Sequence, residues 1–464
     1  MPRRTLHGRL LVMASASGAL LGCSISAMNQ TLDDVQREFA LSSVYQGIVV
    51  SSLLVGALVG CLTAGSLTDC WGRRTMLGVA GAVGAVAALV CAMAPAAAVL
   101  AGGRFALGLS VGAASTVAPV MIGELASARA RGSVVTVYQL VLTVGILVTF
   151  LLGLEQAAAH QWRWMFVLNA VPAVVLVVAV RLLPPAPGDL LARGRDGEAL
   201  EVLRTGRPSA EADEEFASLR AVRDRPVERH AAWRAVMHRE HRLPAAIAVG
   251  AGLMAALVGI GAVVYYSTLV FASAGVGGRL GAVIATLSLG VVNVAVTVAA
   301  LWLIRRFGRR PLLSAGLAGM AGSLTVTAVF LMIGTGGVSG AVTVAAVIVY
   351  ISCFAFSTGP LTWLIIAEIL PSTIRAPVAG SAAAANWAAN LLVALVFPIW
   401  AGTPASPQRI GTAFLFFAAL AILFLVLIRR YMPETKDRPL AEVQALFHVD
   451  GGSGVAARQT GDDD

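Results

Sequence analysis

Residues 69 to 74 read Asp69-Cys70-Trp71-Gly72-Arg73-Arg74, a short charged segment between two long apolar runs. The segment Arg305-Arg306-Phe307-Gly308-Arg309-Arg310 also lies between two apolar runs, with the same Gly-Arg-Arg sequence and with an Arg in place of Asp69. A polar turn that recurs in the same apolar setting indicates an internal repeat. We therefore expect the chain to consist of two related halves.

The composition is that of a membrane protein. Of the 464 residues, 58% are apolar and 13% are charged, and the mean hydropathy is +0.81. These values lie outside the range of soluble proteins. About 20 apolar residues cross the roughly 30 Å hydrocarbon core as a helix, because only helical hydrogen bonds satisfy the backbone there. Twelve such runs are present: 10–28, 44–67, 76–95, 97–120, 134–154, 164–180, 244–271, 280–304, 312–334, 341–367, 378–401 and 411–428.

The net charge of +9 would raise nucleic-acid binding as a hypothesis for a soluble protein, but its distribution points to a membrane instead. If the N-terminus is cytoplasmic, only Arg37, Arg163, Arg279 and Arg409 lie in outer segments, and Arg104 alone lies within a span. All other Lys and Arg residues are then cytoplasmic, as the positive-inside rule requires. We predict a multi-pass protein of the cytoplasmic membrane with both termini cytoplasmic, whose partner is the bilayer and not nucleic acid.

A polar stretch divides the apolar runs into six and six. Residues 181–243 hold 12 of the arginines, and the segments 197–204 and 211–220 place apolar residues at helical spacing among charges. Short amphipathic helices are expected there. The predicted domains are an N-terminal six-helix bundle (1–183), a cytoplasmic linker (184–242), a C-terminal six-helix bundle (243–430) and a cytoplasmic tail (431–464).

One further local pattern bears on the packing of helices. Glycines four residues apart occur in the first, second and fourth runs, and this spacing favours close helix contact. They are Gly18 and Gly22, Gly56 and Gly60, and Gly108 and Gly112.

The segment after the first run carries Asp33, Asp34, Arg37 and Glu38, which predicts a solvated outer loop.

Charged residues recur at matching places in the two halves. Glu124 is followed seven residues later by Arg131, and Glu368 by Arg375 in the same way. Because Arg pairs with carboxylates in a bidentate way, these residues and the Gly-Arg-Arg turns could lock the cytoplasmic helix ends together in one state and release them in another. The alternative is that the arginines only anchor helices at the lipid headgroups.

A longer set of motifs runs in order along the chain. In the first half they are Asp69 to Arg74, Gly103-Arg104-Phe105 with Gly108 and Gly112, Pro119 with Glu124 and Arg131-Gly132, Gln139-Leu140 with Gly145, and Trp162-Arg163. In the second half they are Tyr265-Tyr266, Asn293, Gly308 to Leu313, Gly359-Pro360 with Trp363 and Glu368, Asn386-Trp387 with Asn390, and Pro433-Glu434-Thr435-Lys436. With them the sequence resembles the sugar porter family of the major facilitator superfamily over nearly its whole length. The resemblance implies the major facilitator fold and secondary transport by alternating access.

The resemblance also implies a central solute site and a gate. The site residues would be Gln139, Asn293, Trp363, Asn386, Trp387 and Asn390. The gate residues would be Tyr265, Tyr266, Asp69, Arg73, Arg74, Glu124, Arg131, Arg309, Arg310, Glu368 and Arg375. Amides can bind the hydroxyls of a polyol and an indole can cover its C–H face, whereas amides at membrane depth are costly unless they have a partner or ligand. For each Asn an interhelical hydrogen bond remains the alternative.

The chain departs from the family pattern at the site. Two glutamines of the family fall on Ala255 and Ala256, and an asparagine falls on Gly261. Since a hydrogen bond contributes roughly 0.5 to 1.5 kcal/mol net, a hexose in the usual pose should bind more weakly. A smaller, less hydroxylated or partly apolar solute is expected.

A second departure concerns coupling. Proton-coupled members of the family carry an Asp in the first span that pairs with the arginine matched by Arg104, and here Ser24 stands at that place. A hydroxyl cannot bind and release a proton in this pH range, so we expect a facilitator; the alternative is coupling elsewhere, with Asp33 and Asp34 as candidates. Arg104 then needs another partner, which could be an outer-loop carboxylate, helix carbonyls or an anionic substrate.

The sequence thus predicts a monomeric secondary transporter for a small polar solute of the sugar or polyol class. We see no phosphate-binding loop, metal-ligand cluster or nucleophile-base pair, so we expect no enzymatic activity, cofactor or metal. Two other functions stay open: an exporter of drugs or secondary metabolites on the same scaffold, and a sensor that binds a solute without carrying it.

Overall fold

The computed structural model describes residues 3–159, 161–224, 236–334, 336–370, 372–402 and 404–436, and all regular elements within them are helices. Twelve helical spans are long and apolar enough to cross a membrane. The first six are α1 (Arg3–Phe39), α2 (Ser43–Trp71), α3 (Arg73–Ala92), α4 (Ala97–Leu125), α5 (Ala128–Ala159) and α6 (Arg163–Arg181). The last six are α11 (Arg239–Leu257) with α12 (Ile260–Ser273), α13 (Gly278–Arg306), α14 (Arg309–Ile333), α15 (Gly337–Phe356) with α16 (Thr358–Ile369), α17 (Ser372–Ala401) and α18 (Pro407–Tyr431).

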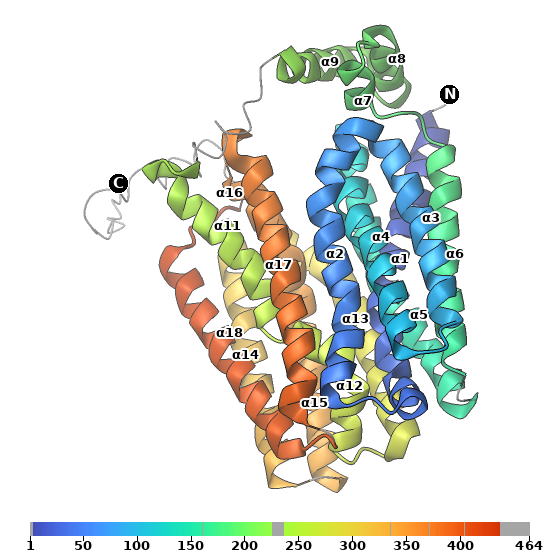
Figure 1. Cartoon of the computed structure of the whole chain (residues 1–464). Helices are drawn as coiled ribbons and strands as arrows, with labels where there is room; N and C mark the ends of the chain where they lie inside the picture. The colour runs from blue at the N-terminus through green and yellow to red at the C-terminus, as the bar shows by residue number, and fades with distance from the viewer. Residues whose placement is uncertain are drawn as a thin grey trace, which may run out of the picture.

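The helices form two bundles that stand side by side (Figure 1). Contacts between the bundles run through three helix pairs: α1 with α12, α2 with α17, and α5 with α13. The linker helices α7 (Pro187–Ala192), α8 (Asp196–Gly206) and α9 (Ser209–Asp224) lie together at one end of the N-terminal bundle, which we call the linker end. The predicted class, an all-α membrane protein with twelve spans in two bundles, is confirmed.

Small residues bring α2 and α4 into backbone contact. A Cβ added at Gly56 would lie 3.0 Å from the Cα of Gly108, and one at Gly60 would lie 3.0 Å from the Cα of Leu109. In the same way, a Cβ added at Gly22 of α1 would lie 3.2 Å from the backbone nitrogen of Ile146 in α5. The close packing predicted from the glycine spacing is therefore confirmed, and it fixes the core of the N-terminal bundle.

The first span differs from the prediction. Helix α1 continues to Phe39, so the expected outer loop is helical, and Asp34 is buried in it. Glu38 accepts hydrogen bonds from the Trp162 indole at 2.6 Å and from Arg163 Nη2 at 2.6 Å. The segment is thus helical and not a loop, and Asp34 is not solvated, whereas Arg37 and Glu38 are exposed as predicted.

The seventh and tenth spans are each interrupted, although the apolar runs 244–271 and 341–367 read as continuous. Gly259 separates α11 from α12 with a φ of 95°, a left-handed conformation that glycine adopts without steric cost. The Tyr350 hydroxyl donates to the carbonyl of Val258 at 3.0 Å, which satisfies an acceptor at this break. Ser357 separates α15 from α16, and Pro360 in the first turn of α16 has no N–H to donate.

Candidate functional site

At the linker end of the N-terminal bundle, Arg73 joins α3, α4 and α7. Its Nε lies 2.9 Å from Glu124 Oε1, and its Nη1 forms an ion pair with Asp189. The backbone nitrogen of Arg73 also donates to Asp189 Oδ2 at 2.6 Å, so this carboxylate caps the N-terminus of α3. Gly72 has a φ of 87°, and a Cβ there would lie 2.9 Å from Asp189 Oδ2. The close approach of Asp189 explains the glycine of the Gly-Arg-Arg turn.

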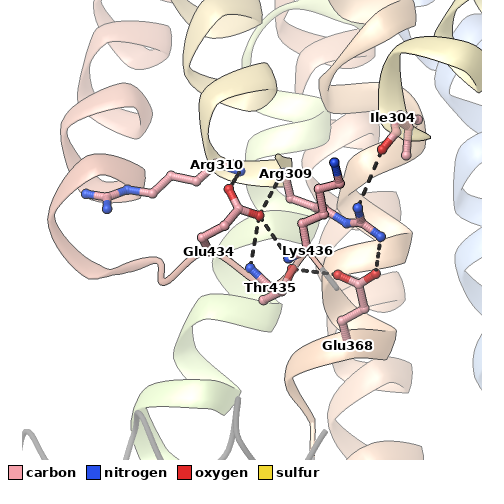
Figure 2. Close-up of polar contacts among 7 residues, drawn as sticks. All are labelled: Ile304, Arg309, Arg310, Glu368, Glu434, Thr435 and Lys436. Carbon is pink, nitrogen blue, oxygen red and sulfur yellow. Dashed lines mark hydrogen bonds and ion pairs between the residues drawn. The ribbon is translucent and has the colours of Figure 1, made fainter. Parts of the chain in front are cut away.

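The C-terminal bundle repeats this arrangement with different sequence (Figure 2). Arg309 Nη2 lies 2.9 Å from Glu368 Oε1. Glu434 accepts from the backbone nitrogens of Arg309 at 2.9 Å and Arg310 at 3.1 Å, and so caps α14 as Asp189 caps α3. The Thr435 hydroxyl donates to Glu368 Oε2 at 2.6 Å and ties the segment after α18 to α16.

These two clusters account for most of the predicted gate residues. Arg74 donates to the carbonyl of Arg181 at 2.7 Å, and Arg310 donates to that of Arg429, again at matching places. Asp69 lies exposed at the end of α2. The side chains of Arg131 and Arg375 lie outside the described part of the chain. The Glu–Arg pairs described here each tie helix ends together within one bundle, and their release in another state stays a prediction.

Two carboxylates of these clusters were not predicted as gate residues. Asp189 follows a proline-rich segment, and no sequence feature marked it except that it is an acidic residue near many arginines. Glu434 lies in a motif that the sequence analysis recognised, but its contacts with the Gly-Arg-Arg turn depend on the packing of α14 against α18.

At the far end of the molecule, Asn29 binds α1 to α12. Its Nδ2 donates to the carbonyl of Val264 at 2.6 Å and to the Ser267 hydroxyl at 2.7 Å. Its Oδ1 accepts from the Thr268 hydroxyl at 2.6 Å. Nearby, Gly47 of α2 packs so closely on α17 that an added Cβ would lie 2.8 Å from the carbonyl of Leu395. The two bundles are thus held together at this end by a buried polar contact and by close packing.

Arg104 is fully buried, and its guanidinium donates to backbone carbonyls of α2. Nε donates to Val49 at 2.8 Å and Nη2 to Val50 at 3.1 Å. The sequence left three kinds of partner open for Arg104, and the structure shows helix carbonyls as its partners. Ser24 donates instead to Asn169 Oδ1 of α6 at 3.5 Å.

The predicted gate tyrosines lie on α12 and are both buried. The Tyr266 hydroxyl donates to the carbonyl of Ala394 at 2.6 Å, and its ring lies 5.2 Å from that of Phe397. Tyr266 therefore ties α12 to α17 within the C-terminal bundle.

Four of the predicted solute-binding residues of the C-terminal bundle lie on α16 and α17. Asn386 Nδ2 donates to the carbonyl of Gly252 in α11 at 3.0 Å, and Asn390 Nδ2 donates to the carbonyl of Asn386 at 3.0 Å. Both amide nitrogens are therefore engaged within the bundle. Trp387 is half-buried, while Trp363 is 45% exposed although it lies in an apolar span.

The remaining predicted site residues, Gln139 of α5 and Asn293 of α13, are half-buried and lie on two helices that pack together across the bundles. Gly290 of α13 approaches Leu147 of α5, with an added Cβ 3.3 Å from the Leu147 Cα. Asn293 lies about one turn and Gln139 about two turns from this contact, both toward the linker end.

The three positions where amides of the family are missing are packed against neighbours. Ala255 and Ala256 are buried. A Cβ added at Gly261 would lie 3.2 Å from Asn390 Oδ1 and 3.3 Å from a ring carbon of Tyr265. Asn390 thus occupies the space beside the position where the family has an asparagine. Among the described residues, no group of three or more His, Cys, Asp or Glu side chains could hold a metal ion.

Twelve spans in two bundles, with a polar cluster beside two interrupted spans, define a transporter of the major facilitator fold. The sequence profile of the family described as "Sugar (and other) transporter" matches residues 14–447. The chain belongs to this family of membrane transporters and is not an enzyme.

Individual relatives match over nearly the full length. The chain is 30% identical to the glucose transporter GlcP of Staphylococcus epidermidis, over 94% of this chain and 96% of that one. It is 32% identical to the galactose-proton symporter of Escherichia coli K12, over 93% of this chain and 92% of that one. Its fold is similar to that of the inward-open conformation of the xylose transporter XylE from E. coli, with a TM-score of 0.80 and 24% identity over 95% of this chain and 99% of that chain.

Proposed function

We propose that the protein carries a small polar solute of the sugar or polyol class across the cytoplasmic membrane by alternating access, as a monomer with both termini cytoplasmic. The carrying observation is the pair Asn386 and Asn390 on α17, with Asn386 bonded to α11 of the interrupted seventh span and Trp363 exposed on α16 of the interrupted tenth span. Discontinuous spans commonly form solute sites near the midplane. The sugars carried by the named relatives support the solute class. The basic residues near the linker end support its cytoplasmic location.

The contacts of the two asparagines suggest how a solute is bound. Both Nδ2 groups already donate to carbonyls, and Asn386 Oδ1 also accepts from Asn390 Nδ2 at 3.4 Å, so Asn390 Oδ1 and the second lone pair of Asn386 Oδ1 are the acceptors offered to solute hydroxyls. The exposed indole of Trp363 offers an apolar face for C–H groups. Ala255 and Ala256 are buried and Gly261 lies against Asn390, so these three positions offer no amide to a solute, in keeping with a compact solute that is less hydroxylated than a hexose.

We also propose that the resting state of the protein is inward-facing, with the far end closed. Asn29 and Gly47 hold the bundles together at the far end, whereas the Arg73 and Arg309 clusters act within their own bundles at the linker end. Alternation would then require the Asn29 contacts to break when the far end opens.

Counterflow in liposomes tests the function. Purified protein should exchange a labelled pentose, hexose or polyol from a panel, and Trp363→Ala should not. Exchange of anions or apolar drugs alone would contradict the solute class, and specific binding without exchange would favour the sensor.

We further propose that transport does not require a proton gradient, because Ser24 cannot titrate and Arg104 is held by backbone carbonyls. Initial uptake by the wild type should be the same at equal and unequal pH. Ser24→Asp restores a carboxylate and should make uptake pH-dependent. Strong dependence of the wild type on the gradient would refute the facilitator, and the search for a coupling group would move to Asp33 or Asp34.

A further inference from the structure

A cavity of about 550 Å³ lies between α1, α5 and α6, away from the solute site. Helix α1 packs against both other helices and forms the floor between them. The lining is aliphatic apart from Ser15, Cys23, Thr149 and Asn169. We call this cavity the α1/α5/α6 groove. A volume in this range suits a small apolar ligand.

The groove opens on the outer surface of the N-terminal bundle. Val12, Val148 and Val171 line it and are 48%, 43% and 57% exposed, and all three lie in membrane spans. The surrounding medium at this surface is therefore lipid. Along α1 the lining runs from Leu11 to Cys23, about 18 Å of helix, which is similar to the roughly 15 Å that one leaflet contributes to the hydrocarbon core.

Basic side chains gather beyond the linker end of this groove. Arg9 lies one turn before Val12, and its Nη1 donates to the carbonyl of Leu182 at 2.6 Å. Arg74 donates to the carbonyl of Arg181, whose own side chain is exposed. Three guanidiniums thus surround the end of α6, at the level where the headgroup of a lipid seated in the groove would lie. Arginines at this level attract anionic lipids.

We propose that the α1/α5/α6 groove binds one acyl chain of an anionic phospholipid, with the phosphate against Arg9, Arg74 and Arg181. The apolar lining and the length of the groove suit the chain, and the arginines supply charge complementarity to the headgroup. The site is separate from the solute path, so it does not depend on the identity of the solute.

Native mass spectrometry of the purified full-length protein, titrated with phosphatidylglycerol or phosphatidylcholine, tests the proposal. The wild type should retain one phosphatidylglycerol more tightly than phosphatidylcholine. Val171→Trp fills the groove and should weaken retention about tenfold, as expected if two or more buried methylene groups are displaced. Val174→Trp is the matched control, because Val174 is 51% exposed on the same helix and does not line the groove.

A double variant tests the binding of the lipid headgroup separately from the binding of the acyl chain. Arg9→Gln combined with Arg181→Gln should remove the preference for phosphatidylglycerol and should weaken phosphatidylcholine retention less, because the choline of that lipid already offsets its phosphate charge. Should Val171→Trp fail to fold, Val148→Trp fills the groove from α5. Equal retention by groove and control variants would overturn the proposal, as would a wild-type dimer that carries no lipid, since the groove would then bind a second copy.

Discussion

Asp189 and Glu434 hold equivalent places in the two bundles, yet one belongs to a linker helix and the other to the segment after the last span. Each accepts from the first backbone nitrogens of a helix that begins with Arg-Arg, and each lies beside an Arg–Glu pair. The same contacts are thus made by segments of unrelated sequence. At the linker end, the two bundles therefore share the same geometry and charge, although different segments supply the carboxylate.

In the middle of the membrane, by contrast, the two bundles differ in structure. The first and fourth spans of the N-terminal bundle, α1 and α4, are continuous, whereas the corresponding seventh and tenth spans break at Gly259 and Ser357. The asparagines and the exposed indole also lie in the C-terminal bundle. We infer that the N-terminal bundle acts as the more rigid body and that the C-terminal bundle adapts around the solute.

The largest expected effect comes from removing the indole of Trp363. Trp363→Ala should lower transport by about tenfold or more, as expected for an aromatic anchor, with little loss of folded protein. Gln139→Ala in the N-terminal bundle should cost less if the C-terminal bundle holds most solute contacts. Transport assays in liposomes measure both. Trp400→Ala, at the far end of α17, serves as the control, and an equal loss in all three variants would remove the distinction between the bundles.

Next in size is the loss of the Asn29 contacts between the bundles. Asn29→Ala removes four hydrogen bonds, each worth roughly 0.5 to 1.5 kcal/mol, so the ratio of far-end-closed to far-end-open molecules should fall at least about tenfold. Outside labelling of Leu395→Cys by an impermeant maleimide, in a background without the five native cysteines, measures the opening. Thr31→Val loses only a bond within α1 and should not change labelling. Unchanged labelling in Asn29→Ala would show that packing alone closes this end.

A smaller shift is expected from neutralising one carboxylate in each charged cluster. Glu368→Gln and Glu124→Gln each weaken by about 1 kcal/mol a partly buried pair that is formed in the inward-facing state, which should shift the population roughly fivefold away from that state. Cysteine accessibility from the linker side measures the shift. Shifts of equal size would support equivalence of the two clusters, whereas a shift in only one variant would break it.

The smallest effect concerns the caps. Asp189→Asn and Glu434→Gln should each reduce the unfolding free energy by about 1 kcal/mol, because a capping carboxylate becomes neutral. Thermal unfolding in detergent, compared with Glu198→Gln on the exposed surface of α8, measures the difference. No change in Asp189→Asn would mean that the linker contributes nothing to holding α3.

The sequence by itself determined the twelve spans, the two halves and the polar turns between them, because hydrophobic length and charge position are local properties matched to the thickness of a bilayer. The Gly-Arg-Arg turns and the Glu positions could be read directly, and so could the family. The interruption of the seventh span could not be read from hydropathy, because an apolar run is equally apolar on both sides of Gly259.

Only the tertiary structure decided which groups meet. Arg73 contacts Asp189, which lies 116 residues away in the sequence, and Asn29 contacts Thr268, which lies 239 residues away. Arg104 takes carbonyls of α2 as its partners, a choice that depends on α2 and α4 lying in backbone contact. Partners of buried polar groups are set by which helices become neighbours, and no local pattern of side chains carries that information.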